Sequence, residues 1–306
     1  MSGHPWAFHL HWVALASTLA AGLGAGAAQR WGGPSTRRQR LAVATAIVVV
    51  LVAFQWPLAD LAARWSLAAL VLQRLALMIA VPGLLLVGLP APLLRAATRP
   101  AAVDGLLRRA ARPPVAVAVV TAVAVATLTT VAVDAQANDP AVQAAVDLLL
   151  VVAGVVLWLP VIGRVPAIRR PSALGRAAYL VVQSIVPSFL AVVWIFARHP
   201  LYPVYAHAPA GLGIAPVTDQ QVAGFVAKLG TIVALWSVAA VIVLRDERRP
   251  ADTGDSEPLT WDDVERQLER AERAERRGRR WGLYLPPAAD RPGGGDSPPG
   301  GADAPT

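Results

Sequence analysis

Three charged side chains lie inside long apolar stretches, where a buried charge is costly: Arg74, Asp147 and Lys228. At 1.5 Å per helical residue, each falls about 8–12 Å from the same end of the bundle that these stretches would form. Because opposite charges offset the cost of burial, we expect Arg74 and Asp147 to pair. Polar neighbours near the same level complete a predicted intramembrane cluster: Asp134, Gln73 and Gln143. The alternative is that each long side chain reaches the membrane surface separately.

Three histidines near the N-terminus, His4, His9 and His11, form the second group with possible chemistry. Neutral imidazoles bind copper or zinc, and ordinary interfacial histidines are the alternative interpretation. If Met1 were removed, Ser2, Gly3 and His4 would offer an amine, two amides and an imidazole. Four nitrogens of this kind suit square-planar Cu(II). Copper is therefore the cofactor that the sequence leaves open.

Enzymatic motifs are missing from the sequence. It contains no nucleophile elbow, phosphate-binding loop, dinucleotide fingerprint or His-Glu-x-x-His pattern. The chain has no cysteine, which excludes disulfides, thiol catalysis and Cys-based metal centres. Nothing offers a nucleophile or base with an orienting partner, so we expect no enzymatic activity.

The elements that must position these residues are membrane-spanning helices. The chain is 55% hydrophobic and only 16% charged, far from the average for soluble domains. Crossing about 30 Å of hydrocarbon takes about 20 apolar residues, and only helices satisfy the backbone there without closing a barrel. The sequence predicts an all-α bundle of seven transmembrane helices, at approximately residues 6–28, 41–59, 66–89, 114–133, 142–163, 177–197 and 220–244.

The arginines between the predicted spans indicate orientation. Segments 29–40, 90–113 and 164–176 hold four, five and four arginines, whereas 1–5, 60–65, 134–141 and 198–219 hold zero, one, zero and one. Arginine and lysine accumulate on the cytoplasmic side. The sequence therefore predicts an extracytoplasmic N-terminus and a multi-pass protein of the plasma membrane. Because the net charge of +8 serves mostly as this signal, we expect no nucleic-acid partner.

The N-terminal apolar run resembles a cleaved signal in its small residues at 25–28, but it lacks a positive n-region and is interpreted as a span. After residue 245 the composition becomes charged and then rich in Pro and Gly. We expect residues 1–245 to form the membrane domain and 246–306 a cytoplasmic tail. The tail is predicted to hold one helix at about 261–280 and to be disordered from Pro286 onward.

Several stretches of the membrane domain resemble one family. They are residues 72–90, Gly154 with 157–161, 199–206 and 213–224. These stretches look like the multi-spanning CtaG family, assembly factors of caa-type cytochrome c oxidase. Its outer loop motif falls on Tyr202, Pro203, Tyr205, Asp219, Gln220 and Gln221. The resemblance covers roughly residues 1–245.

The sequence departs from that family at the polar positions inside the spans. Where the resemblance implies two histidines in the third span, this chain has Leu70 and Arg74. The other departures fall on Thr127, Leu128, Gln143, Val146, Asp147, Ala227 and Lys228. These residues bind copper or haem poorly, although Asp147 suits a harder ion. The resemblance thus implies the family's fold with a degenerate metal-type site.

These observations favour a scaffold or assembly partner of a respiratory cytochrome c oxidase, with oxidase subunits and the lipid bilayer as partners. The alternative is a membrane transporter or channel with an outward-facing polar cavity. Discontinuous helices or an inverted repeat would favour transport, but seven spans do not divide into two halves.

Overall fold

A computed structural model describes residues 22, 24, 26–27, 35–163, 171–185, 188–206 and 212–248. Every regular element in these ranges is helical, so the all-α membrane fold is confirmed. The chain separates into two units, Met1–Arg248 and Arg249–Thr306. The predicted tail helix at 261–280 and almost all of the predicted first span at 6–28 lie outside the described residues.

Four stretches among the described residues are long and apolar enough to cross a membrane. They match the third, fifth, sixth and seventh predicted spans closely. Counting the bent helix pairs raises the number to six, so the predicted count of seven and the orientation stay predictions. The four are Leu67–Gly88 (α4, Leu67–Leu75; η2, Ala76–Ala80; α5, Val81–Gly88), Pro140–Ile162 (α10), Ala173–Phe196 (α11, Ala173–Ile185; α12, Ser188–Phe196) and Pro216–Glu247 (α13).

The second predicted span is a bent pair. Helix α2 (Arg37–Phe54) is followed, at an angle of 52°, by Leu58–Trp65, which comprises α3 (Leu58–Asp60) and the π-helical η1 (Leu61–Trp65). Thr36 begins α2 with a capping box that it forms with Gln39. The expected end of this span at residue 59 therefore lies inside the second limb of the pair.

The fourth predicted span, 114–133, is interrupted in the structure. Helix α8 (Pro113–Thr127) ends at Thr127, and α9 (Thr130–Asn138) begins after it. The Thr129 side chain accepts a hydrogen bond of 3.3 Å from the amide of Ala132, which caps α9. An unbroken helix over 114–133 was therefore a wrong expectation. Before α8, the short helices α6 (Ala91–Ala97) and α7 (Ala101–Ala110) follow the third span, and α7 meets α8 at 87°.

The third span changes its winding near its centre. The π-helical η2 precedes Pro82, which has no backbone N–H to donate to the preceding turn. The indole of Trp158 on α10 donates a hydrogen bond of 2.8 Å to the carbonyl of Ile79. Gly154 allows the close approach of α10, because a Cβ there would lie 2.2 Å from the carbonyl oxygen of Met78. The backbone carbonyl of Ile79 at the break thus receives its hydrogen bond from a side chain of the neighbouring helix.

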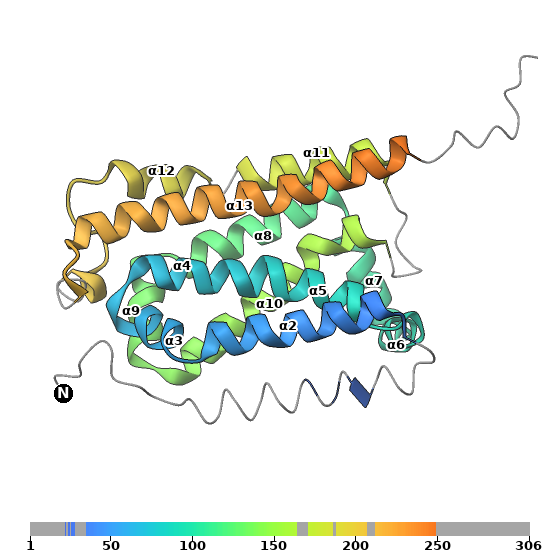
Figure 1. Cartoon of the computed structure of the whole chain (residues 1–306), viewed down its shortest axis with the longest axis horizontal. Coiled ribbons are helices and arrows are strands. Elements are labelled where there is room, and N and C mark those ends of the chain that lie inside the picture. The colour runs from blue at the N-terminus through green and yellow to red at the C-terminus, as the bar shows by residue number, and fades with distance from the viewer. Residues whose placement is uncertain are drawn as a thin grey trace, which may run out of the picture. The chain divides into compact units, whose positions relative to one another are not determined.

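The long helices α2, α10, α11 and α13 run roughly along the long axis of the view, and α13 extends past both α11 and α12 (Figure 1). One apolar core joins η2, α5, α8, α10, α11 and α13, and Leu157, Leu180 and Leu235 are buried in it. A second core at the other end gathers Trp194 and Tyr205. Large exposed apolar side chains, such as Phe189 and Phe196, face outward as expected for lipid contact. The second core lies next to the polar residues considered below.

Candidate functional site

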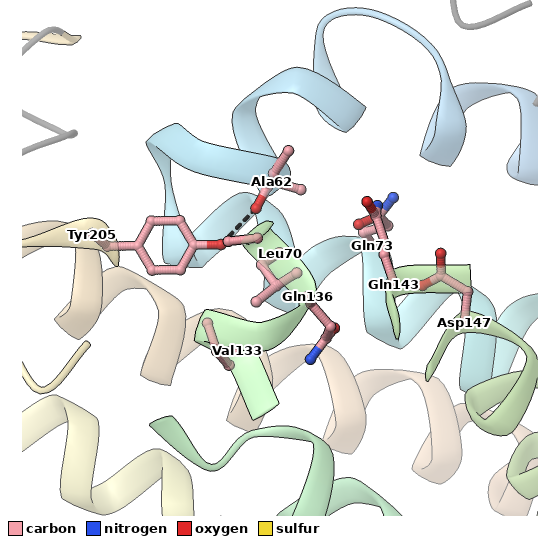
Figure 2. A pocket seen from close by; sticks show the side chains of 10 residues that line it. Ala62, Leu70, Gln73, Val133, Gln136, Gln143, Asp147 and Tyr205 are labelled. Carbon is pink, nitrogen blue, oxygen red and sulfur yellow. Dashed lines mark hydrogen bonds between the residues drawn. The ribbon is translucent and has the colours of Figure 1, made fainter. Parts of the chain in front are cut away.

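A small cavity joins polar side chains from four separate parts of the first unit (Figure 2). Its volume is about 20 Å³, enough for about one water molecule. Apolar walls come from Leu70 and Val133, among others. The polar lining consists of Gln73 of α4, Gln136 of α9, Gln143 and Asp147 of α10, and Tyr205 of the 3-10 turn η3 (Pro203–Tyr205). The structure thus brings Gln73, Gln143 and Asp147 together, as the sequence predicts.

Arg74 lies beside this cavity and is held by hydrogen bonds to two neighbouring elements. Its guanidinium donates 2.8 Å hydrogen bonds to the carbonyl of Thr127 and to Oε1 of Gln136. Gln136 in turn donates from Nε2 to the carbonyl of Ala132, at 2.7 Å. The side chain of Arg74 is buried, so these contacts replace the water that a guanidinium loses on burial. Arg74 therefore joins the end of α8 to α9.

The expected ion pair between Arg74 and Asp147 is not formed within the described residues. Neither a salt bridge nor a hydrogen bond joins the two side chains, although their charges attract each other through space. The pairing prediction overlooked Gln136 and the carbonyl at the α8 break, which take the donors of Arg74. Asp147 instead faces the small cavity with Gln143 and Gln73 (Figure 2).

The remaining members of the predicted cluster have different positions. Gln73 lines the cavity but directs Nε2 to the carbonyl of Ala53 on α2, at 2.9 Å. Lys228 is half-buried on α13 and lines neither the small cavity nor the one described next. Asp134 on α9 also lines neither cavity, and its buried Oδ1 accepts no hydrogen bond from a described residue. The structure therefore does not bring Lys228 and Asp134 to the cluster.

A second cavity, of about 60 Å³, lies on the other side of Arg74. Its lining includes Arg74, Thr127, Leu128 and Ala227, with the thioether-bearing Met78. Most positions at which this chain departs from the family pattern therefore line one of the two cavities: 70, 143 and 147 line the first, and 74, 127, 128 and 227 line the second. Positions singled out by the family resemblance thus line two cavities, and Arg74 lines the second of them.

The donor types at these positions do not fit copper. Soft or imidazole ligands are needed, and the converging side chains are a guanidinium, amides, a hydroxyl, aliphatic groups and one carboxylate, with Met78 the one thioether. No group of three His, Cys, Asp or Glu able to hold a metal occurs among the described residues. His4, His9 and His11 lie outside the described residues.

The outer loop motif closes the same end of the bundle. Tyr202 donates a hydrogen bond of 2.6 Å to the carbonyl of Leu128, and Tyr205 donates one to the carbonyl of Ala62 in η1. Burial raises the pKa of both phenols, so both donate as neutral hydroxyls. Pro203 is exposed in η3. Tyr202 thus ties the loop to the break in the fourth predicted span, and Tyr205 ties it to η1.

The first turns of α13 anchor the loop and the third span. The Asp219 carboxylate accepts hydrogen bonds from Oγ of Ser66 at 2.6 Å and from the amide of Leu67 at 2.7 Å, so it caps α4 from another helix. Gln220 accepts a hydrogen bond of 2.8 Å from the amide of Leu201. Gln221 is only half-buried and has no role in these contacts. Four residues of the motif, Tyr202, Tyr205, Asp219 and Gln220, thus link separate elements of the fold.

Sequence reasoning gave no role to Ser66 and Gln136, and it named Thr127 only as a departure from the family pattern. Gln136 falls in a polar stretch that was assigned to a loop, although Gln136 and Ala132 have helical i, i+4 spacing. Ser66 precedes an apolar run, which is the signature of a helix N-cap, and its Oγ accepts a hydrogen bond from Ala69 at 3.2 Å. The carbonyl of Thr127 had no sequence signal, because it becomes available only where α8 ends.

Comparison with known proteins identifies the family. A family model described as cytochrome c oxidase caa3 assembly factor (Caa3_CtaG) matches residues 19–248, which is most of the chain. No curated protein and no solved structure matches significantly. The matched range contains both cavities, Arg74 and the outer loop motif. The helical membrane fold and this match agree with the resemblance found in the sequence, and the chain belongs to the family of cytochrome c oxidase caa3 assembly factors.

Proposed function

We propose that this protein acts as a scaffold during assembly of a cytochrome c oxidase in the plasma membrane, without enzymatic turnover. The observation that carries the proposal is the family match over residues 19–248. The outer-end links support a scaffold role, because Tyr202, Tyr205 and Asp219 each join segments distant in sequence. A partner subunit would thereby meet a surface with a defined shape, which lowers the ordering cost of binding.

The polar cluster is proposed as the functional centre of this scaffold. Asp147 and Gln143 present oxygen and nitrogen atoms to a cavity with room for about one water, and Arg74 connects that cavity to α8 and α9. A space of about 20 Å³ is too small for a transported solute larger than water, so its size does not favour the transporter alternative. Within the proposal, the cluster keeps the outer ends of α4, α9 and α10 in register.

A deletion strain provides the test of the proposed function. Loss of the protein should lower the haem a absorbance of isolated membranes, and an affinity-tagged wild type should restore it and co-purify oxidase subunits. Asp147→Leu removes the cavity carboxylate and should restore assembly poorly. Asp246→Asn alters an exposed carboxylate at the far end of α13 and is the matched control. Normal oxidase content in the deletion strain, with no subunit co-purified, would contradict an assembly role.

The proposal includes no copper inside the bundle, because the donor set around Arg74 is unsuited to it. Any bound copper is assigned to His4, His9 and His11. Metal analysis of the purified wild type and of a variant with all three histidines changed to alanine tests this assignment. Stoichiometric copper that survives the triple substitution would reveal a ligand set within the bundle.

The proposed orientation, with an extracytoplasmic N-terminus, places the arginine-rich segments in the cytoplasm. Reporter fusions after Ala206 and after Arg249 should report opposite sides of the membrane. An alkaline phosphatase fusion should be active after Ala206 and inactive after Arg249. Equal activity at the two positions would overturn the orientation.

A further inference from the structure

A groove of about 890 Å³ lies at the opposite end of the bundle from the polar cluster. Helices α2 and α13 contribute to its sides, and η2 and α5 lie between them. Its apolar wall includes Leu84, Val87, Trp158, Val238 and Ile242. The volume is near the upper end of the range for small-molecule sites.

The length of the groove matches one leaflet of a bilayer. Along α13 its lining extends from Ala234 to Arg245, which at 1.5 Å per residue is about 16 Å. Half of a hydrocarbon core of about 30 Å is about 15 Å. The lining along α13 is therefore about as long as an acyl chain in one leaflet.

The charged end of the groove is entirely positive. Arg38 lies in the first turn of α2, Arg176 in the first turn of α11 and Arg245 in the last turn of α13. No Asp or Glu occurs among the described residues that line the groove. Arg38 and Arg245 are exposed, whereas Arg176 is 8% exposed. Three guanidinium groups around an apolar groove complement a phosphate attached to hydrocarbon.

We propose that this groove binds an anionic phospholipid, with the phosphate on the three arginines and an acyl chain along α5 and α13. The charge of the rim and the leaflet length of the apolar wall both select a lipid over another helix, which would extend across both leaflets. Zwitterionic lipids carry a compensating positive group and gain less from the arginines. The site is independent of the proposed assembly role and adds a binding function to the arginine-rich end.

Native mass spectrometry of the full chain tests the site with phosphatidylglycerol and phosphatidylcholine of identical acyl chains. We expect phosphatidylglycerol to bind at least about 30-fold more tightly than phosphatidylcholine. Each arginine near an anionic headgroup raises the binding affinity about fivefold. The double variant Arg38→Gln with Arg245→Gln should therefore bind phosphatidylglycerol about 30-fold more weakly and bind phosphatidylcholine with unchanged affinity. Both substituted residues are exposed and the buried Arg176 is left unchanged, so we expect the variant to fold.

Two controls separate a specific site from general attraction. Arg95→Gln with Arg99→Gln removes two exposed arginines that lie outside the groove and should leave lipid affinity unchanged. Ser237→Trp fills the groove without changing charge and should weaken both lipids. Equal affinity for the two lipids, or equal losses in the two double-arginine variants, would overturn the proposal. A photo-crosslinker at Ser237 should yield a lipid adduct, and an adduct to residues 1–34 or to another protein would refute it.

Discussion

Replacing Asp219 with asparagine tests whether the last helix stabilises the start of the third span. Asp219 is 4% exposed and accepts hydrogen bonds from Ser66 and Leu67 through its two oxygens. Asparagine keeps one side-chain oxygen as an acceptor, but its NH2 group takes the place of the other oxygen and faces one of the two donors, Ser66 Oγ or the Leu67 amide. Losing one hydrogen bond to a charged acceptor lowers the free energy of unfolding by about 1.5–3 kcal/mol. Losing the negative charge at the helix N-terminus lowers it by about 0.3–1 kcal/mol more.

The sum, about 2–4 kcal/mol, should lower the midpoint of thermal unfolding in mild detergent by about 5–15 °C. Fluorescence-detected size exclusion of heated samples measures this midpoint. Asp246→Asn changes an exposed carboxylate at the other end of the same helix and should remain within about 0.5 kcal/mol of wild type. Ser66→Ala combined with Asp219→Asn should cost less than the sum of the single substitutions, because both remove the same hydrogen bond. An Asp219→Asn midpoint equal to that of wild type, or additive losses, would refute the reasoning.

Four further substitutions test three other contacts by the same assay. Gly154→Ala should lower stability by about 3 kcal/mol, because the new Cβ would lie 2.2 Å from the Met78 carbonyl oxygen, and a midpoint unchanged from wild type would contradict this approach. Arg74→Leu with Gln136→Leu should cost less than the two single substitutions summed, with a coupling of about 0.5–3 kcal/mol, whereas additivity would exclude their contact. Tyr205→Phe should cost about 1 kcal/mol. Burial raises the pKa of Tyr205 above its value in the unfolded chain, which is about 10. The wild type should therefore lose stability as the pH rises above about 10, and Tyr205→Phe should lose less stability over the same pH range.

Helix content and the position of most spans were predictable because apolar length alone determines them. The range 66–89 was predicted and α4 to α5 covers Leu67–Gly88. The break between Thr127 and Thr130 was not predictable from hydropathy, since Leu128 and Val131 continue the apolar run and the interruption depends on Thr129 as a cap. Hydropathy reflects the free energy of transferring a side chain from water to lipid, and it carries no information about local hydrogen bonds such as a helix cap.

For the polar cluster, sequence reasoning addressed depth along each helix but not contacts. Rise per residue predicts a similar depth for Arg74 and Asp147, and in the structure Asp147 lines the first cavity and Arg74 lines the second. The sequence does not show how each side chain is rotated about its helix axis, nor which acceptors compete for Arg74. In the structure, Arg74 donates to the carbonyl of Thr127 and to the side-chain amide oxygen of Gln136. Lys228 has a similar predicted depth but lines neither cavity.

The cap that Asp219 provides for α4 has a consequence for biosynthesis. Ser66 and Asp219 are separated by 153 residues, so α4 leaves the ribosome long before its capping carboxylate exists. At about 5–20 residues per second, the delay is roughly 8–30 s. During that time the amide of Leu67 must rely on water or lipid headgroups. A nascent chain that stops before α13 can insert its earlier helices but lacks the carboxylate that caps α4, which distinguishes incomplete translation products from the finished protein.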